Sequence, residues 1–163
     1  MFDNKPIFDM LDRLGIKYTA VKHDAVHTME DLKPIEQQLG AVFFRNLFLC
    51  NRQKTQFYLL LMPGNKPFHT KDLTGQLGCS RLSFAGEEPM HELLGVTPGS
   101  VSVLGLLNDT ENRVRLVIDR DVLQPEFFAC HPCRNTSSLR IATADLTGRI
   151  LPALRHEPDY VSL

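Results

Sequence analysis

Positive charge is not in excess in this sequence. Its 163 residues include 18 Lys and Arg against 19 Asp and Glu, which gives a formal net charge of −1 at pH 7. Proteins that grip long nucleic acids do so through many Lys and Arg contacts to phosphates. The charge balance therefore excludes genomic DNA as a partner, while a local contact with a few phosphates remains compatible with it.

Long apolar runs are also missing. No stretch approaches the roughly 18 apolar residues of a membrane span, and the first ten residues contain Asp3 and no apolar region typical of a secretory signal. Four Cys in a chain of this length do not make a disulfide scaffold. These absences predict a cytoplasmic protein with reduced thiols and no membrane partner.

Apolar residues make up 43% of the sequence, which is enough for one core. A chain of this length fits one domain, which we place at residues 1–163. Two apolar segments separated by the polar stretch Asn51–Lys54 predict a hairpin of Val42–Cys50 and Thr55–Met62. The other expected strands are Ile16–Val21, Arg81–Phe84, Val101–Leu107, Val114–Ile118, Phe127–Cys130 and Leu139–Ala142.

Helices are expected among these strands, closed by Gly or broken by Pro. They are Pro6–Leu14, Thr28–Gly40 with a break at Pro34, Thr70–Leu77, Glu87–Leu94 and Ala144–Leu154. The irregular alternation predicts an α/β (α+β) fold, in which helices pack on a mixed sheet of six or seven strands, rather than a regular βαβ array.

Cys130-His131-Pro132-Cys133 is a Cys-x-x-Cys motif with three interpretations. In the first it is a dithiol redox centre, because a nearby imidazolium lowers the pKa of a thiol. In the second it is half of a zinc site, although Cys50 and Cys79 lack the spacing to complete one. In the third interpretation the thiols are incidental and His131 is functional. The loop-like residues that follow favour this third interpretation, because a redox motif needs its first Cys at a helix N-terminus.

His23-Asp24-Ala25-Val26-His27 resembles the His-Glu-x-x-His zinc signature, which works only when both His share one helix face. Here the segment follows an expected strand and precedes a helix cap, so no metalloprotease site is expected. His69, His91 and His156 lie in polar surroundings and are expected at the surface.

Two further segments are candidates for binding a carbonyl or an anion. In Gly95–Ser102, two glycines flank Pro98, and such a loop bends so that successive N–H groups approach a ligand. Taken alone, it is more typical of an ordinary helix-to-strand turn. Arg45-Asn46 interrupts an apolar strand, and its guanidinium must either reach solvent or face a pocket that needs positive charge.

Taken together, these segments resemble the prolyl-tRNA editing domain family (the YbaK/ProRS-associated deacylases) and, within it, the freestanding ProX branch. Five segments in order along the chain carry the resemblance. They are Arg45–Leu49, Arg81–Ala85, Leu94–Ser102, Gly105–Asp109 and the His131-Pro132-x-x-Asn135-Thr136 motif.

The resemblance implies an editing-domain fold with a partly barrel-like sheet. It also implies hydrolysis of the ester that joins a wrong amino acid, chiefly alanine, to the terminal adenosine of tRNA for proline. No metal and no cofactor are implied. The expected partner is the acceptor end of aminoacyl-tRNA, and prolyl-tRNA synthetase is a further candidate.

Residue by residue, the Lys of the family corresponds to Arg45, beside Asn46, and the His of its motif to His131. Its Gly-x-x-x-Pro loop ends here at Val103, where the family has Pro. Arg45 keeps the positive charge but not the compact ammonium group. The expected catalytic residues are Arg45, Asn46, Gly99, Ser100, Val101, Ser102 and His131. The expected substrate contacts are Phe44, Leu104, Gly105, Leu106, Asn135 and Thr136.

Hydrolysis of an activated ester needs a held carbonyl, donors aimed at the developing oxyanion and a positioned water. The loop backbone would supply the donors, Arg45 would bind the terminal phosphate, and a closed apolar pocket would select a small amino acid. We therefore expect three distant stretches to converge on one small cavity. The alternative is a non-catalytic module that binds charged tRNA or a synthetase.

Overall fold

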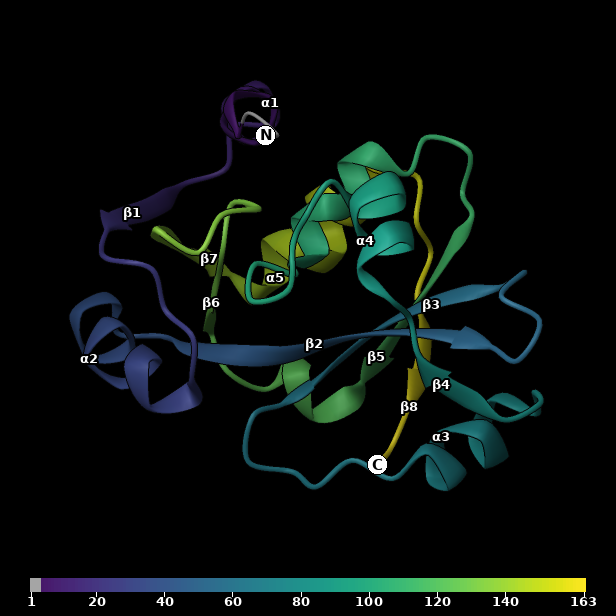
Figure 1. Cartoon of the computed structure of the whole chain (residues 1–163). Coiled ribbons are helices and arrows are strands. Elements are labelled where there is room, and N and C mark those ends of the chain that lie inside the picture. Colours follow the sequence, from purple (N-terminus) through teal and green to yellow (C-terminus); the bar gives the residue numbers. More distant parts are fainter. Residues whose placement is uncertain (1–3) are drawn as a thin grey trace.

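Strand β2 (Val42–Asn51) joins two parts of one sheet. On one edge it pairs antiparallel with β3 (Phe57–Pro63), which is the hairpin expected from the sequence. On the other edge, β6 (Phe127–Cys130) pairs with its first residues and β4 (Leu82–Phe84) with its last. The structure, a computed structural model, describes residues 4–163, and no strand within them covers this edge at residues 44–48 (Figure 1).

The other strands extend a mixed sheet in the order β1-β7-β6-β2-β3-β5-β8. β1 (Tyr18–Lys22), β7 (Ser137–Ala142) and β6 pair antiparallel, whereas β3, β5 (Val114–Asp119) and β8 (Asp159–Val161) pair parallel. The mixed sheet confirms the predicted fold class. It has eight described strands rather than six or seven, and β8 was not expected because three residues are too few to show an alternating pattern.

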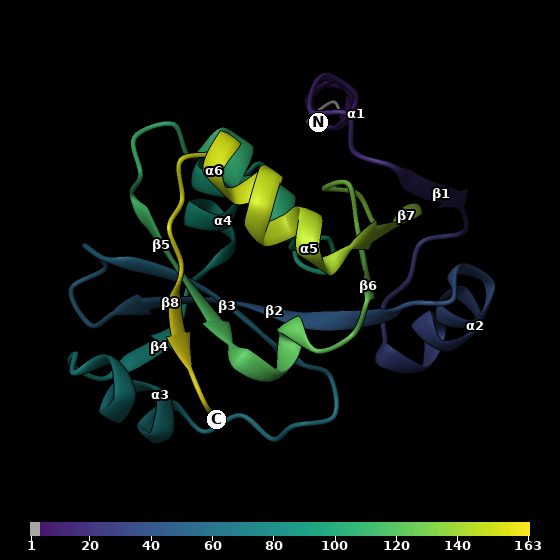
Figure 2. The ribbon, with the colours of Figure 1, turned by 180° about the vertical axis from the view of Figure 1, so that it is seen from behind.

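Helices cover both faces of the sheet (Figures 1 and 2). The larger core lies under α1 (Lys5–Arg13), α4 (Glu87–Leu94), the 3-10 helix η1 (Val103–Asn108) and the C-terminal helical segment. That segment consists of α5 (Thr143–Asp145), the π-helical turn η3 (Leu146–Ile150) and α6 (Leu151–Ala153). A smaller core lies under α3 (Thr70–Leu77), on the opposite face, and η2 (Arg120–Leu123) follows β5. None of the helices in residues 4–163 has the length and apolar character to cross a membrane.

The side chains of β2 are divided among three clusters, because successive residues of a strand point to opposite faces. Phe44 and Phe48 belong to the larger core and Leu49 to the smaller one. Phe43 packs with α2 (Met29–Leu39) at the end of the sheet formed by β2 and β6. The residues between, 45–47, remain half-buried at the uncovered edge.

The expectation of a strand at Val101–Leu107 is wrong, because the chain forms η1 there. The hydroxyl of Ser102 accepts a hydrogen bond from the backbone N–H of Leu104 at 3.2 Å, which caps the helix. A short, fully buried apolar run has no periodicity that separates strand from helix. The polar residue at its start therefore decides the outcome.

The expected break at Pro34 is also wrong. Helix α2 runs through it, starting from a capping box in which Thr28 and Asp31 bond each other's backbone. Burial of Leu32, Ile35 and Leu39 on one face outweighs the single hydrogen bond that the proline removes.

Candidate functional site

The uncovered edge of β2 opens onto a cavity of about 250 Å³. Its walls come from the three stretches that the sequence analysis expects to converge, and in addition from α2. The lining residues are Phe43, Phe44, Arg45, Asn46 and Leu47 from β2, Gly99 and Val101 from the loop before η1, Cys130 and His131 from the end of β6, and Met29 and Leu32 from α2. The structure thus brings Arg45, Asn46, Gly99 and His131 to one place.

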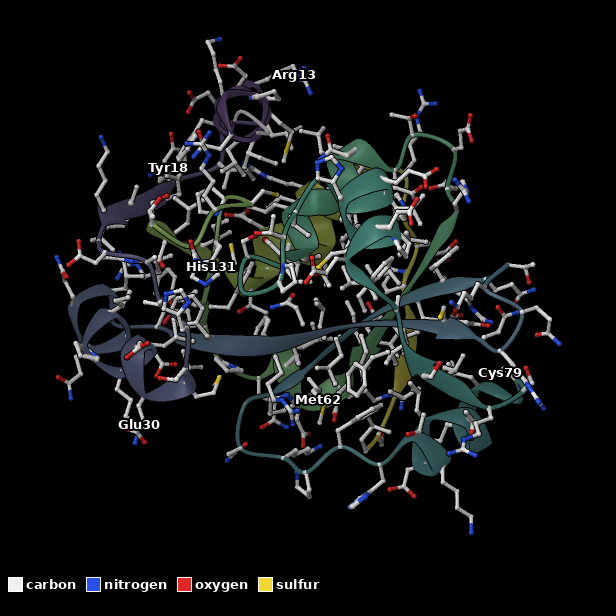
Figure 3. All side chains as sticks on the ribbon, viewed as in Figure 1. Arg13, Tyr18, Glu30, Met62, Cys79 and His131 are labelled. Carbon is white, nitrogen blue, oxygen red and sulfur yellow. The ribbon has the colours of Figure 1, made fainter. Side chains whose placement is uncertain are left out.

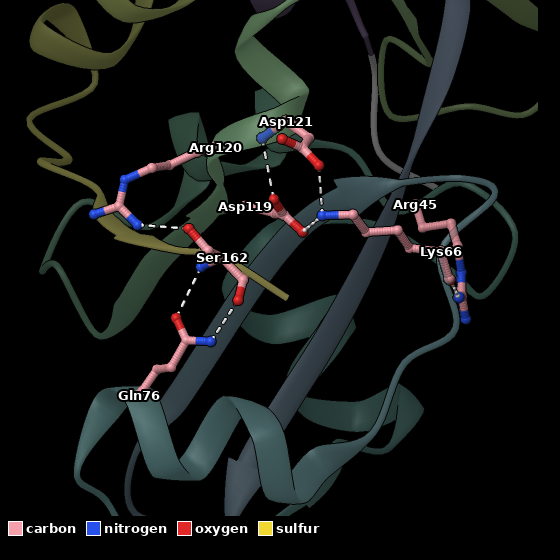
Figure 4. Close-up of polar contacts among 7 residues, drawn as sticks. All are labelled: Arg45, Lys66, Gln76, Asp119, Arg120, Asp121 and Ser162. Carbon is pink, nitrogen blue, oxygen red and sulfur yellow. Dashed lines mark hydrogen bonds and ion pairs between the residues drawn. The ribbon is translucent and has the colours of Figure 1, made fainter.

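Arg45 supplies the positive charge of this cavity. Its Nη1 donates to the backbone carbonyl of Lys66 at 3.0 Å, and no carboxylate of residues 4–163 forms an ion pair with it (Figure 4). The ammonium of Lys66 is held instead by Asp119 at 2.9 Å and Asp121 at 2.7 Å, which raise the pKa of Lys66. The charge of Lys66 is therefore neutralised, whereas that of Arg45 remains available to an anion.

The loop before η1 presents backbone to the cavity. Gly99 has φ 89°, a left-handed conformation that glycine adopts without strain. The hydroxyl of Ser100 accepts from the N–H of Thr97 at 3.1 Å and donates to its carbonyl at 2.9 Å, so this side chain is used inside the loop. Gly99 and Val101 line the cavity, and Ser100 does not. The loop can therefore contribute backbone groups but no serine nucleophile.

His131 is buried and is one of the residues that line the cavity. Its Nδ1 lies 3.1 Å from the carbonyl of Ser137, and its ring packs 5.2 Å from that of Phe43 (Figure 3 shows its position). Burial lowers the pKa of His131 from its ordinary value of 6.5, against the opposing effect of the Ser137 carbonyl, and His23 lowers it further. At neutral pH the imidazole is therefore uncharged and offers a lone pair.

Asn46 turns its amide back along its own strand. Its Nδ2 donates to the carbonyl of Phe44 at 3.2 Å, and within the described chain its amide oxygen has no hydrogen-bond donor. Asn46 is therefore placed to accept a hydrogen bond from a ligand in the cavity.

The sequence of this chain matches a family of known proteins. Residues 23–148 match the family model described as the aminoacyl-tRNA editing domain. The chain belongs to this family. It is 33% identical over 136 residues to the prolyl-tRNA editing protein ProX of Acetoanaerobium sticklandii, an alignment that covers 83% of each chain.

A second relative is the prolyl-tRNA synthetase associated domain-containing protein 1 of Danio rerio. It is 33% identical over 160 residues, which are 97% of this chain and 86% of that protein. Among solved structures, a putative trans-editing enzyme for prolyl tRNA synthetase superposes with a TM-score of 0.70 at 17% identity. The superposition covers 100% of this chain and 99% of the other, which shows that the two proteins share a fold.

Seven of the thirteen expected site residues do not line the cavity, and four of these lie in η1 or directly before it. Leu104, Gly105 and Leu106 are buried in η1 against the core, and none of them lines the cavity. Ser102 is fully buried and caps η1. Of the three residues expected to form the apolar pocket, only Phe44 is in place, and Met29 and Leu32 of α2 supply the other apolar walls.

Asn135 and Thr136 lie at a neighbouring cavity of about 490 Å³, which Ser100 and His91 also line. The amide of Asn135 donates to the carbonyl of Val26 at 3.0 Å, and Gly99 lies beside it. A Cβ on Gly99 would come within 3.7 Å of the Asn135 amide nitrogen. Asn135 therefore ties the loop before η1 to the segment before α2.

The two Cys of the Cys-x-x-Cys motif are unsuited to redox chemistry. Both are free thiols, and burial raises the pKa of Cys130 and raises that of Cys133 to about 12. The thiolate is the reactive form of cysteine, and a raised pKa makes it scarce at neutral pH. The structure thus argues against the dithiol interpretation.

In residues 4–163, no group of three or more His, Cys, Asp or Glu side chains is arranged to hold a metal ion. His23 and His27 lie on the segment between β1 and α2, not on a helix, so they do not form the helical zinc signature.

Proposed function

We propose that this protein hydrolyses the ester of mischarged aminoacyl-tRNA, with alanine on tRNA for proline as its main substrate. One observation carries the proposal: an unneutralised guanidinium, a bent loop that presents backbone and an uncharged buried imidazole line the same small cavity. The family and the names of its relatives support the substrate class.

Each wall of the cavity would have one task in this reaction. Arg45 would bind the phosphate of the terminal nucleotide, because a guanidinium matches phosphate oxygens with paired donors. Backbone N–H groups of the Gly99–Val103 loop would stabilise the oxyanion that develops on the ester carbonyl. The unprotonated nitrogen of His131 would accept a hydrogen bond from the attacking water or from a ribose hydroxyl. Asn46 would accept one from the ammonium group of the amino acid.

The size of the cavity supports a small amino acid. About 250 Å³ must hold the acyl group and part of the ribose, and the apolar wall is formed by Phe44, Met29 and Leu32. Forcing a larger side chain into a packed site costs about 1–3 kcal/mol, whereas a smaller one meets no barrier. We therefore expect alanine to react, glycine and serine to react as well because the cavity excludes them poorly, and proline to be rejected.

The acceptor end of tRNA is the main proposed partner, and prolyl-tRNA synthetase is a second one. The cytoplasm is the proposed location. The net charge of −1 is compatible with this partner, because a single-stranded end needs few phosphate contacts. The proposed reaction uses no metal and no cofactor, since the ester is already activated.

Incubation of the purified protein with alanyl-, seryl-, cysteinyl- and prolyl-tRNA for proline tests the proposal. We expect alanine release well above the spontaneous rate, little release of proline, and no change on addition of a chelator. Binding of alanyl-tRNA in a gel-shift assay with no hydrolysis would instead identify the non-catalytic module. Arg45 and Val103, where the family has Lys and Pro, are the features that favour this alternative. If all four tRNAs stay charged and unbound, both functions are excluded.

A further inference from the structure

His131 is connected to a second histidine through a buried hydroxyl. Ser138 Oγ lies 3.3 Å from His131 Nδ1 and 2.7 Å from His23 Nε2. Ser138 is fully buried, whereas His23 is only half-buried. The two imidazole rings are 6.3 Å apart, so the hydroxyl is their link.

Two backbone carbonyls fix the direction of the hydrogen bonds that link His23, Ser138 and His131. A carbonyl oxygen only accepts, so His131 Nδ1, at 3.1 Å from the carbonyl of Ser137, must carry a proton. For the same reason His23 Nδ1, at 2.8 Å from the carbonyl of Asp24, must carry one. In the neutral ring His23 Nε2 is therefore an acceptor, and the hydroxyl of Ser138 donates to it. The lone pairs of Ser138 then face the Nδ1–H of His131.

We propose that His23 acts through Ser138 as a positioning residue that keeps the unprotonated Nε2 of His131 available to the cavity. This inference rests on the proposed function, in which that nitrogen accepts a hydrogen bond from water or ribose. Nothing in the predicted motifs assigns a role to His23 or to Ser138.

The need for His23 follows from what Ser138 does without it. The two imidazoles are the hydrogen-bond partners of the Ser138 hydroxyl in the described chain. If the acceptor at His23 is removed, the buried hydroxyl hydrogen turns to Nδ1 of His131, because an unpaired buried donor is costly. That bond favours the tautomer with the proton on Nε2, which fills the acceptor site facing the cavity.

Substitutions of His23 separate positioning from simple packing. His23→Phe keeps the ring and loses the acceptor, and we expect kcat for alanyl-tRNA deacylation to fall about tenfold with little change in KM. His23→Gln places an amide oxygen near the position of Nε2, and we expect it to restore most of the rate. Equal loss of rate in both variants would overturn the proposal, as would an unchanged rate in His23→Phe.

A double variant gives a sharper test. Ser138→Ala removes the hydroxyl that would drive the wrong tautomer, while the Ser137 carbonyl still holds the Nδ1–H of His131. We therefore expect His23→Phe with Ser138→Ala to be faster than His23→Phe alone. A purely structural role of His23 predicts the opposite, since the second substitution would add further damage, and that result would overturn the proposal.

The tautomer of His131 is measurable without substrate, by nitrogen-15 NMR of the imidazole. We expect protonated Nδ1 in the wild type and in His23→Gln, and protonated Nε2 in a substantial fraction of His23→Phe. An unchanged tautomer in His23→Phe would refute the inference even if the enzyme is active. Conversely, the expected tautomers in a protein without deacylase activity would refute the proposed function alone.

Discussion

Arg45 and Lys66 meet through a backbone carbonyl and not through their charges. Nη1 of Arg45 donates to the carbonyl oxygen of Lys66 at 3.0 Å, while the Lys66 side chain turns to Asp119 and Asp121 (Figure 4). The carbonyl fixes the guanidinium at the edge of the cavity without cancelling its charge. A lysine at position 45 has no planar fork for engaging a carbonyl and a phosphate together.

Substitution of Arg45 is the first prediction. Loss of a charged hydrogen bond costs about 1.5–3 kcal/mol, so we expect Arg45→Ala to lower kcat/KM for alanyl-tRNA by about 10- to 100-fold. Arg45→Lys should retain part of the rate, because the charge remains. Single-turnover deacylation measures both, and Arg52→Ala, in the exposed turn between β2 and β3, is the matched control. Equal rates in Arg45→Ala and Arg52→Ala would contradict the assignment.

The second prediction concerns pH and follows from the lowered pKa of His131. The neutral form persists below pH 6.5, so the rate should stay level from pH 7.5 to 6.5 and fall only at lower pH. The free energy of unfolding should also fall at low pH. The unfolded chain binds the proton near pH 6.5 and the folded one resists it, so the free energy of unfolding falls as pH drops below that value.

Denaturant titrations of the wild type and of His131→Asn at pH 7.5 and 5.5 test the stability part. The wild type should lose more of its unfolding free energy between these pH values than the variant does. A larger loss in the variant would mean that the folded protein favours the charged imidazole.

The fold could be predicted where a local signal was strong. Gly78 and Gly95 end their helices as expected, and the polar turn at Asn51 predicted the hairpin. The strand expected at Val101–Leu107 is wrong because a buried apolar run has no period that distinguishes strand from helix, and the cap at Ser102 favours the helix. The expectation that His156 lies at the surface is wrong, because its side chain is buried.

Residues that line the cavity could be predicted only where a residue departs from its apolar surroundings or belongs to the family motif. Arg45 is a charge in an apolar strand, and Gly99 and His131 belong to the family motif. Leu104 and Leu106 are apolar in an apolar segment, so the sequence does not distinguish a pocket wall from the core. His23 and Ser138 meet across 115 positions of sequence, and no local pattern signals that contact.

The third prediction concerns Val103, where the family has Pro. Val103 is the first residue of η1, and proline suits the first position of a helix because its missing N–H is not needed there. We expect Val103→Pro to change the unfolding free energy by less than about 1 kcal/mol. Leu104→Pro is the control. It removes the N–H that Ser102 accepts, and it should cost about 3 kcal/mol. Similar stability of the two variants would contradict this placement.

The fourth prediction uses the close approach of η1 to α4. A Cβ on Gly105 would lie 2.9 Å from the carbonyl oxygen of Leu94, so Gly105→Ala must displace backbone. We expect a loss of about 2 kcal/mol in unfolding free energy. Gly75→Ala, inside α3 with nothing within 4 Å, should instead stabilise by about 0.5–1 kcal/mol. Urea titrations compare the two, and a neutral Gly105→Ala would show that the contact is not tight.

The last prediction concerns a buried pair that closes the far end of the fold. His156 Nε2 lies 2.9 Å from Asp109 Oδ2, and the same carboxylate accepts from the backbone N–H groups of Arg113 at 2.9 Å and Val114 at 2.8 Å. Asp109→Ala leaves the two backbone N–H groups and His156 Nε2 without their partner, and we expect it to cost about 3 kcal/mol.

His156→Phe leaves Asp109 its two backbone partners and keeps a ring of similar shape, so its cost should be smaller, about 1–2 kcal/mol. Glu92→Ala removes an exposed ion pair with Arg113 and should stay within about 0.5 kcal/mol. This order of stabilities, measured by urea denaturation, follows from burial, because the two side-chain contacts have similar distances, 2.9 and 3.3 Å. If Glu92→Ala proved as costly as Asp109→Ala, the buried carboxylate would not be what holds β5 to the C-terminal segment.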